Sequence, residues 1–234
     1  MGVLLMATFH SSMQLSAVSN HSDKYVTKGD TLKVPSQFST IAEAVEKSSD
    51  GDIIIIALGK YMEKNIILNK AITITSQWKL TGDESTINKT IIDSDGEKLF
   101  LIRTDGIEIS GLKIINGDHT LEVAARVKII HNHFSGNLDA ISMEAGAGGY
   151  IAHNIMENDI DDGVDIDIGD DGNEMIGSDV IIEYNTIINS HDDGIEIRLF
   201  SRPDQNVKYI IRRNTIIGSG NAGVQLISYD LPTG

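Results

Sequence analysis

The chain has 234 residues, no cysteine and a formal net charge of −15, with 34 acidic residues against 19 basic ones. Without cysteine it has no disulfide or thiolate chemistry, and its acidic balance argues against nucleic acid and anionic membranes as partners. Hydrophobic residues make up 41% of the chain, which is enough for a sizeable core. The frequent Ile, the 22 Gly and the presence of only 3 Pro favour short strands and tight turns over helices.

Residues 1–30 are polar and unpatterned, and we predict a mobile tail or the remnant of a leader. An apolar run at 3–7 and the small residues Ala17-Val18-Ser19 carry part of a secretory signal pattern, but no Lys or Arg precedes the run. No stretch of the sequence is long and apolar enough to span a membrane.

The next segment combines one helix with several strands. Apolar residues at 38, 41, 42 and 45 mark one face of a helix over 38–48, which Ser39 is predicted to cap. The wholly apolar segments 53–56 and 66–68 and the alternating segment 71–75 read as strands.

From residue 127 the chain repeats a unit of two predicted strands, the first ending in an Asn. The Asn residues are spaced by 22, 31 and 29 residues. A unit this short cannot bury its apolar side alone, whereas stacked units can, and an Asn column bonds from rung to rung. The sequence therefore predicts an all-β parallel solenoid over residues 31–234. The first strands are 127–132, 149–154, 180–185 and 209–214, and the second strands are 140–143, 163–166, 194–197 and 223–226.

Two features of the repeats concern their edges. The longer units gain residues after the second strand, at 169–178 and 199–207, where insertions are expected to wall a binding groove. The chain stops at 229–234 directly after a full coil with no recognisable cap, so we predict that it is part of a longer solenoid.

Acidic residues concentrate in the repeats. Between Asn137 and Ile197 there are sixteen Asp and Glu and no Lys or Arg, and the phrase at 161–166 returns at 192–197. Strand alternation turns the residues at 165, 167, 196 and 198 outward, on rungs roughly 4.8 Å apart. Carboxylates at that separation can share one Ca²⁺. The predicted metal ligands are Asp162, Asp165, Asp167 and Glu196.

The segment 34–75 resembles the opening of pectin-lyase-like right-handed β-helix proteins, with an amphipathic helix followed by Asp-Gly-Asp-Ile-Ile-Ile-Ile and Gly-Lys-Tyr. The Asn-cornered repeats at 127–226 resemble the coil repeat of that superfamily. The resemblance implies a single right-handed parallel β-helix with an N-terminal capping α-helix. It does not fix the activity, because the superfamily includes lyases, glycoside hydrolases, epimerases, esterases, phage tailspikes and non-catalytic surface proteins.

The leading hypothesis is a carbohydrate-active protein that acts on acidic, uronate-containing polysaccharide as a Ca²⁺-assisted lyase. Some lyases of the resembled superfamily use Asp and Glu as calcium ligands and a Lys or Arg as the base, which implies Arg198 as a catalytic base here. A monomer that is secreted, periplasmic or on the cell surface is expected. The further catalytic candidates are His191 and Asp193, and the substrate-binding candidates are Arg202, Lys208 and Arg212.

Two alternatives remain open at this stage. A glycoside hydrolase would use paired carboxylates among Asp162, Asp165, Asp193 and Glu196, but the Gly-His-Gly and Arg-Ile-Lys motifs of the resembled pectin hydrolases are missing. In a non-catalytic solenoid, Asp-Asp-Gly serves as a turn with a left-handed Gly and a capping Asp, and the outward acids form a solvated face.

In the non-catalytic case Arg198 merely pairs with Asp167 at the surface. His131 and His153 share a column, which fits either a surface corner or a metal site.

Overall fold

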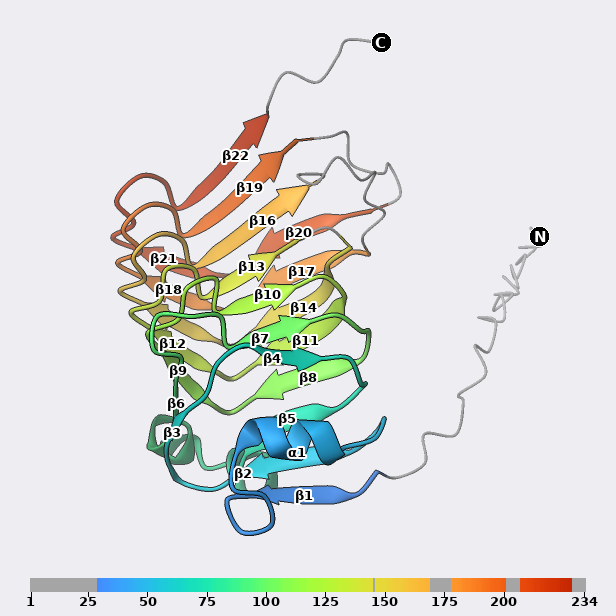
Figure 1. Cartoon of the computed structure of the whole chain (residues 1–234). Coiled ribbons are helices and arrows are strands. Elements are labelled where there is room, and N and C mark those ends of the chain that lie inside the picture. The colour runs from blue at the N-terminus through green and yellow to red at the C-terminus, as the bar shows by residue number, and fades with distance from the viewer. Residues whose placement is uncertain (1–28, 145, 169–177, 201–206, 229–234) are drawn as a thin grey trace, which may run out of the picture.

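The computed structural model describes residues 29–144, 146–168, 178–200 and 207–228. Their strands form three parallel sheets stacked as a column of coils, each complete coil giving one strand to each sheet (Figure 1). The predicted parallel β-helix is therefore confirmed. The tail predicted for residues 1–30 lies, up to residue 28, outside the described residues, as does the segment 229–234.

The chain visits the sheets in a fixed order, from sheet A through sheet B to sheet C. Sheet A consists of β1 (Thr31–Val34), β2 (Ile53–Ile56), β5 (Thr73–Ser76), β8 (Ile107–Ser110), β11 (Arg126–Ile130), β14 (Gly148–Ala152), β17 (Val180–Glu183) and β20 (Tyr209–Arg212). Sheet B consists of β3 (Gly59–Met62), β6 (Thr90–Asp93), β9 (Lys113–Ile115), β12 (His133–Ser135), β15 (Ile155–Glu157), β18 (Thr186–Ile188) and β21 (Thr215–Ile217). Sheet C consists of β4 (Ile66–Leu68), β7 (Phe100–Ile102), β10 (Leu121–Val123), β13 (Ile141–Met143), β16 (Val164–Ile168), β19 (Ile195–Leu199) and β22 (Val224–Ser228).

The predicted N-terminal helix is present as α1 (Ile41–Lys47), which lies at the β1 end of the column (Figure 1). It buries Ile41 and Val45, but its N-cap is Thr40, not the predicted Ser39: the Thr40 hydroxyl accepts the Glu43 N–H at 3.0 Å. Two short helices that the sequence analysis did not predict, α2 (Trp78–Thr81) and the 3₁₀ helix η1 (Glu84–Lys89), follow β5.

The core is a set of apolar columns that run along the helix axis. Phe134, Met156 and Ile187 lie on successive rungs of sheet B and are fully buried. Each residue of this column stands two positions after an Asn of the repeat. On the last described coil, Val224 and Leu226 of β22 are 49% and 65% exposed, because no later described coil covers them.

The corner between sheets A and B is held by a ladder of buried Asn side chains. Asn132, Asn154 and Asn185 each donate their backbone N–H and side-chain Nδ2 to the Oδ1 of the next Asn, at 3.0–3.1 Å. Asn214, at the end of the ladder, accepts both bonds from Asn185. The predicted Asn column is therefore confirmed.

The residue before each ladder Asn has left-handed backbone geometry, and its side chain joins a stack. His131, His153 and Tyr184 have φ between 53° and 57°. Their rings stack at 4.9 and 5.1 Å, with Trp78 against His131 at one end and Arg213 over Tyr184 at the other. The stacked imidazole planes face each other, so their lone pairs do not converge as a shared metal would need. We assign the histidine pair to this corner stack.

The corner between sheets B and C contains a buried Asp, Asp159, at the position that Asn137 occupies in the preceding coil. Asp159 accepts the N–H and the Nδ2 of Asn137 through Oδ1, while its buried Oδ2 has no partner among the described residues. Burial raises the pKa of Asp159 to about 7. Its ordinary value is about 3.9, so wild-type stability should fall as the pH rises from about 4 through 7.

Asp159→Asn is therefore expected to raise the free energy of unfolding by about 1–3 kcal/mol at pH 8 and to change it little at pH 4. Urea denaturation at the two pH values measures the effect. Asp95→Asn is the matched control, because Asp95 is exposed, already has positive φ and its carboxylate pairs with the exposed Lys64. A loss of stability in Asp159→Asn at pH 8 would contradict the prediction.

Candidate carboxylate site on sheet C

The outward columns predicted for sheet C are present in the predicted register. Asp165 pairs with Glu196 and Ser142, Asp167 pairs with Arg198, and the neighbouring Val164 and Ile166 point into the core. Asp165 and Glu196 are nevertheless only 2% and 7% exposed. A solvated acidic face, the expectation of the non-catalytic alternative, is therefore wrong for these two residues.

Arg198 covers the carboxylates. Its Nε lies 2.7 Å from Asp167 Oδ1 and 3.2 Å from Glu196 Oε2, and its terminal nitrogen donates to Asp165 Oδ2. The single surface pair with Asp167, considered in the sequence analysis, is thus one of three contacts. The guanidinium contacts both carboxylates of β16 because Asp165 and Asp167 stand two residues apart on the strand that pairs with β19, and the planar group carries several N–H donors.

The same contacts govern protonation. Burial opposes the charge of Arg198, but Asp165 and Asp167 outweigh it and raise the pKa of the guanidinium. Deprotonated Arg198, which a base role needs, is disfavoured in this arrangement. Burial raises the pKa of Asp165 to about 7 and that of Asp162 to about 8, and it also raises the pKa of Glu196. With pKa values close to neutrality, Asp162 and Asp165 can exchange a proton for a cation at neutral pH.

An Asp ladder precedes sheet C, at the corner that follows sheet B. Asp139 Oδ1 accepts the N–H of Asp162 at 3.0 Å, Asp162 Oδ1 accepts that of Asp193 at 2.7 Å, and Asp193 Oδ1 accepts that of Ala222 at 2.6 Å. Asp162 and Asp193 therefore have a structural task besides their predicted metal-binding and catalytic roles. The capping Asp of the turn hypothesis is confirmed.

The glycines of the Asp-Asp-Gly phrases do not take the predicted left-handed conformation. Gly163 and Gly194 are absent from the residues with positive φ. A Cβ at Gly163 would lie 2.7 Å from the Gly194 oxygen, and one at Gly194 would lie 2.5 Å from a methyl group of Ile216. Close packing between rungs, not turn geometry, explains these glycines.

His119, which was not among the predicted site residues, occupies the rung before Asp139 in the Asp ladder column. Its Nδ1 lies 2.6 Å from Asp139 Oδ2, and this bond raises the pKa of the imidazole. The side chain of Asp139 is 2% exposed and that of His119 is 35% exposed. The available signal was its position, two residues before β10, as Asp139 is two residues before β13.

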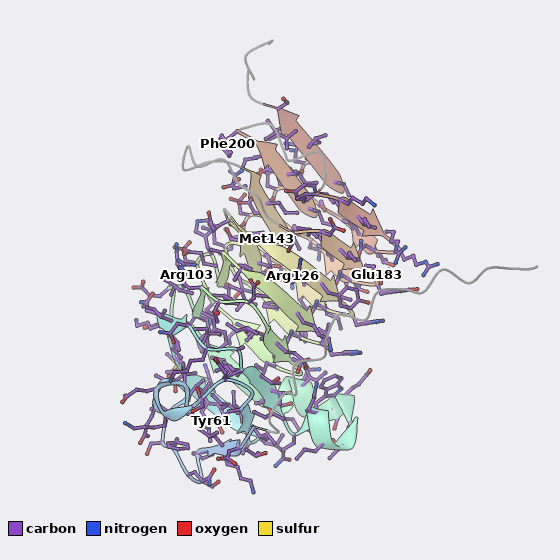
Figure 2. The ribbon with its side chains drawn as sticks, turned by 90° about the vertical axis from the view of Figure 1, so that its right-hand side faces the viewer. Tyr61, Arg103, Arg126, Met143, Glu183 and Phe200 are labelled. Carbon is purple, nitrogen blue, oxygen red and sulfur yellow. The ribbon has the colours of Figure 1, made fainter. Side chains whose placement is uncertain are left out.

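The other predicted site residues are dispersed. His191 is exposed at the corner before sheet C, and Lys208 is exposed beside β20, its backbone N–H bonded to Asp179 at 2.9 Å. Arg212 lies on sheet A and bonds Glu183 at 2.6 Å; Figure 2 shows Glu183 on the side of the column away from Arg103, which follows β7 of sheet C. Arg212 is thus not brought to the carboxylates, and Arg202 lies outside the described residues.

Among the residues that the structure describes, acidic side chains form two groups whose oxygens lie close enough for a shared cation. In the first, single oxygens of Asp162, Asp165 and Glu196 all lie within 4.8 Å of one another, and all three residues are buried. Asp161 and Asp192 join Asp162 in the second, more open group. Asp167 belongs to neither and is held by Arg198.

The insertions that were predicted to wall a groove lie, at residues 169–177 and 201–206, outside the described ranges. Cavities occur elsewhere along the described part of the column. One of about 250 Å³ lies beside β1 and α2, and one of about 160 Å³ lies between η1 and the corner of His131 and His153.

A family model described as the right-handed beta helix region matches residues 70–231. No curated protein and no solved structure matches the chain. Across the described ranges, the helices are all too short or too polar to traverse a bilayer.

Proposed function

Because the chain belongs to the right-handed β-helix family, we propose that it is a carbohydrate-active member that acts on acidic, uronate-containing polysaccharide along sheet C with the assistance of Ca²⁺. The observation that carries the proposal is Asp165 Oδ1, which is buried without a hydrogen-bond partner among the described residues. It belongs to a side chain grouped with Asp162 and Glu196, whose oxygens lie within 4.8 Å of each other. An orphaned carboxylate oxygen of this kind needs a proton or a cation.

The donor set fits Ca²⁺, which prefers carboxylate oxygens and tolerates irregular geometry. Asp162, Asp165 and Glu196 would hold it, and Arg198 offsets only part of their charge. A bound Ca²⁺ would polarise a uronate carboxylate and acidify the neighbouring C–H.

Charge explains why an acidic polymer requires the cation. A uronate carboxylate approaching Asp165 and Glu196 directly would be repelled, so the cation is the element that makes the site attractive to it. Further along the same sheet, Lys98 and Arg103 flank Glu122 and are 31% and 38% exposed, which provides positive charge for neighbouring uronates. A polymer substrate of this kind fits a protein outside the cytoplasm, at the cell surface, in the periplasm or secreted.

The first test is binding of Ca²⁺. A saturating excess of about 100 times Kd should stabilise the wild type by about 2.7 kcal/mol, which is a shift of about 5–10 °C in Tm for a chain of this size. Asp165→Asn and Glu196→Gln should abolish the shift, and Glu97→Gln, at an exposed acid on another part of the coil, should keep it. A wild-type melting curve that chelator and Ca²⁺ leave unchanged would contradict the metal site.

The second test is activity. The protein is incubated with polygalacturonate, alginate and other uronate polymers, with Ca²⁺ and with chelator, and the absorbance of unsaturated product is followed. Product that depends on Ca²⁺ supports the lyase. Ca²⁺-dependent binding without product would instead identify a non-catalytic carbohydrate-binding solenoid.

One observation favours a glycoside hydrolase as the second candidate. The pKa of Asp162, raised to about 8 by burial, keeps its carboxyl protonated at neutral pH, as a general acid requires. Single oxygens of Asp165 and Glu196 lie within 4.8 Å of one of its oxygens. New reducing ends without unsaturated product, lost in Asp162→Asn, would select this candidate.

A further inference from the structure

The proposed elimination needs a proton acceptor, and the covered guanidinium of Arg198 does not supply one. The described residues of the column hold a different candidate beside the carboxylates. We propose that His119, oriented by the buried carboxylate of Asp139, is the base that takes the proton from the uronate C5. This inference rests on the proposed function and assigns a role at the same site.

Asp139 fixes the orientation of the His119 ring. Asp139 is fixed at both oxygens, because Oδ1 accepts the Asp162 N–H at 3.0 Å and Oδ2 lies 2.6 Å from His119 Nδ1. A buried carboxylate at Nδ1 selects the tautomer with the proton on Nδ1, which leaves Nε2 with its lone pair. With 35% of its side chain exposed, the imidazole can meet a substrate.

His119 also lies in the same column as the proposed metal ligand Asp162. His119, Asp139 and Asp162 occupy successive rungs of one column, each two residues before a strand of sheet C. Because His119 Nδ1 lies 2.6 Å from Asp139 Oδ2, the imidazole reaches the rung of Asp139, which is one rung, roughly 4.8 Å, from that of Asp162. That separation suits a sugar whose carboxylate is bound at Asp162, Asp165 and Glu196 while its C5 faces His119.

The charges around His119 act on the protonation of its ring. Asp139 and Asp118 favour the protonated imidazole and Lys98 opposes it, and the ring in turn acts on the protonation of Asp161 and Glu144. The hydrogen bond to Asp139 dominates and raises the pKa of His119 above its ordinary value. A base with a pKa near the working pH is the most effective.

Water is the one co-reactant that the elimination needs. Nε2 takes the C5 proton, the C5–H electron pair forms the C4=C5 double bond, and the C4–O bond breaks. The leaving oxygen takes a proton from water, and the hydroxide so formed is neutralised by the proton that His119 releases afterwards. One glycosidic bond is thereby converted into one hydroxyl and one unsaturated uronate.

The test compares His119→Gln, Asp139→Asn and the wild type in kcat, in polymer binding and in the Tm shift with Ca²⁺. His119→Gln should lose about 100-fold or more in kcat while both binding measurements stay within about twofold. His153→Gln, at the other corner, is the matched control and should keep the wild-type kcat. Asp139 is a positioning residue, so Asp139→Asn should move the acid limb of the kcat/KM profile to lower pH, and an NMR titration of the His119 ring should move with it.

The outcomes separate the two proposals. Wild-type kcat in His119→Gln, or a loss confined to His191→Gln, overturns the role of His119 and leaves the lyase standing. Loss of polymer binding together with kcat in His119→Gln also overturns it, because the residue then binds and does not catalyse. A wild type that neither binds uronate polymer nor forms product overturns the proposed function and the role of His119 with it.

Discussion

Replacing Arg198 with Met is expected to lower the free energy of unfolding by about 3 kcal/mol at pH 8, because it leaves buried carboxylates without their counter-charge. Three of them, Asp165, Asp167 and Glu196, contact the guanidinium, and Met keeps most of the side-chain volume. Arg198 is 30% exposed, so the expected loss lies at the lower end for a broken buried pair.

The loss should depend on pH in a defined direction. The pKa of Asp165 is already raised to about 7 by burial with Arg198 in place, and removal of the guanidinium raises it further. Stability tied to a raised carboxyl pKa is present at low pH and is lost as the pH rises through the folded value. The difference between wild type and Arg198→Met should therefore be small at pH 5 and full at pH 8.

Urea denaturation at both pH values measures this, with Arg126→Met as the control. Arg126 is exposed on sheet A and bonds Ser178 through Nε at 3.1 Å (Figure 2), so its loss should stay within about 0.5 kcal/mol. Equal losses at pH 5 and pH 8 would show that packing and not charge accounts for the effect. Recovery of part of the loss on adding Ca²⁺ is expected if the proposed metal site is correct.

Asn154→Ala is expected to lower the free energy of unfolding by about 3–4 kcal/mol, because it removes an interior member of the Asn ladder. Asn154 is 1% exposed and donates to Asn185 Oδ1 and to the Ile129 oxygen, while its own Oδ1 accepts two bonds from Asn132. Ala leaves the Asn132 N–H and the Ile129 oxygen buried without these partners.

Asn214→Ala tests whether the loss of stability depends on burial, because it removes the Asn of the last described coil. Asn214 is half-buried, and water can reach the groups that it leaves, so a loss of about 1 kcal/mol is expected. Thermal and urea unfolding of both variants give the comparison. Similar losses at the two rungs would show that the ladder does not depend on burial.

Much of the fold was predictable because, in a solenoid, the spacing of the sequence repeats sets the register of strands in neighbouring coils. The spacing of the Asn residues correctly predicted that Asn132 lies next to Asn154 in the ladder. The alternation of Val164 and Ile166 correctly predicted the inward face of β16. The turn phrase also gave the capping role of Asp162. These features are local or repeat between neighbouring rungs, so a sequence pattern carries them.

The chemistry of the site was less predictable, because it depends on side chains that reach between columns. Nothing in the alternation of β16 and β19 shows that Arg198 contacts Asp165 as well as Asp167 and thereby leaves Asp165 buried. His119 lacks the Asp-Asp-Gly phrase of the later rungs, so only the register of β10 with β13 identifies it as a member of the Asp ladder column.

The two corner ladders have a consequence for how this chain tolerates change. Bonds from side chain to backbone fix the corner after sheet A through Asn154 and the corner after sheet B through Asp162. The corner after sheet C spans residues 144–147 in one coil and 169–179 in another, yet β13 and β16 keep their pairing. Loop length adds little closure entropy, so this corner is the place where foreign segments could be grafted, or recognition loops diversified, without disturbing the coils.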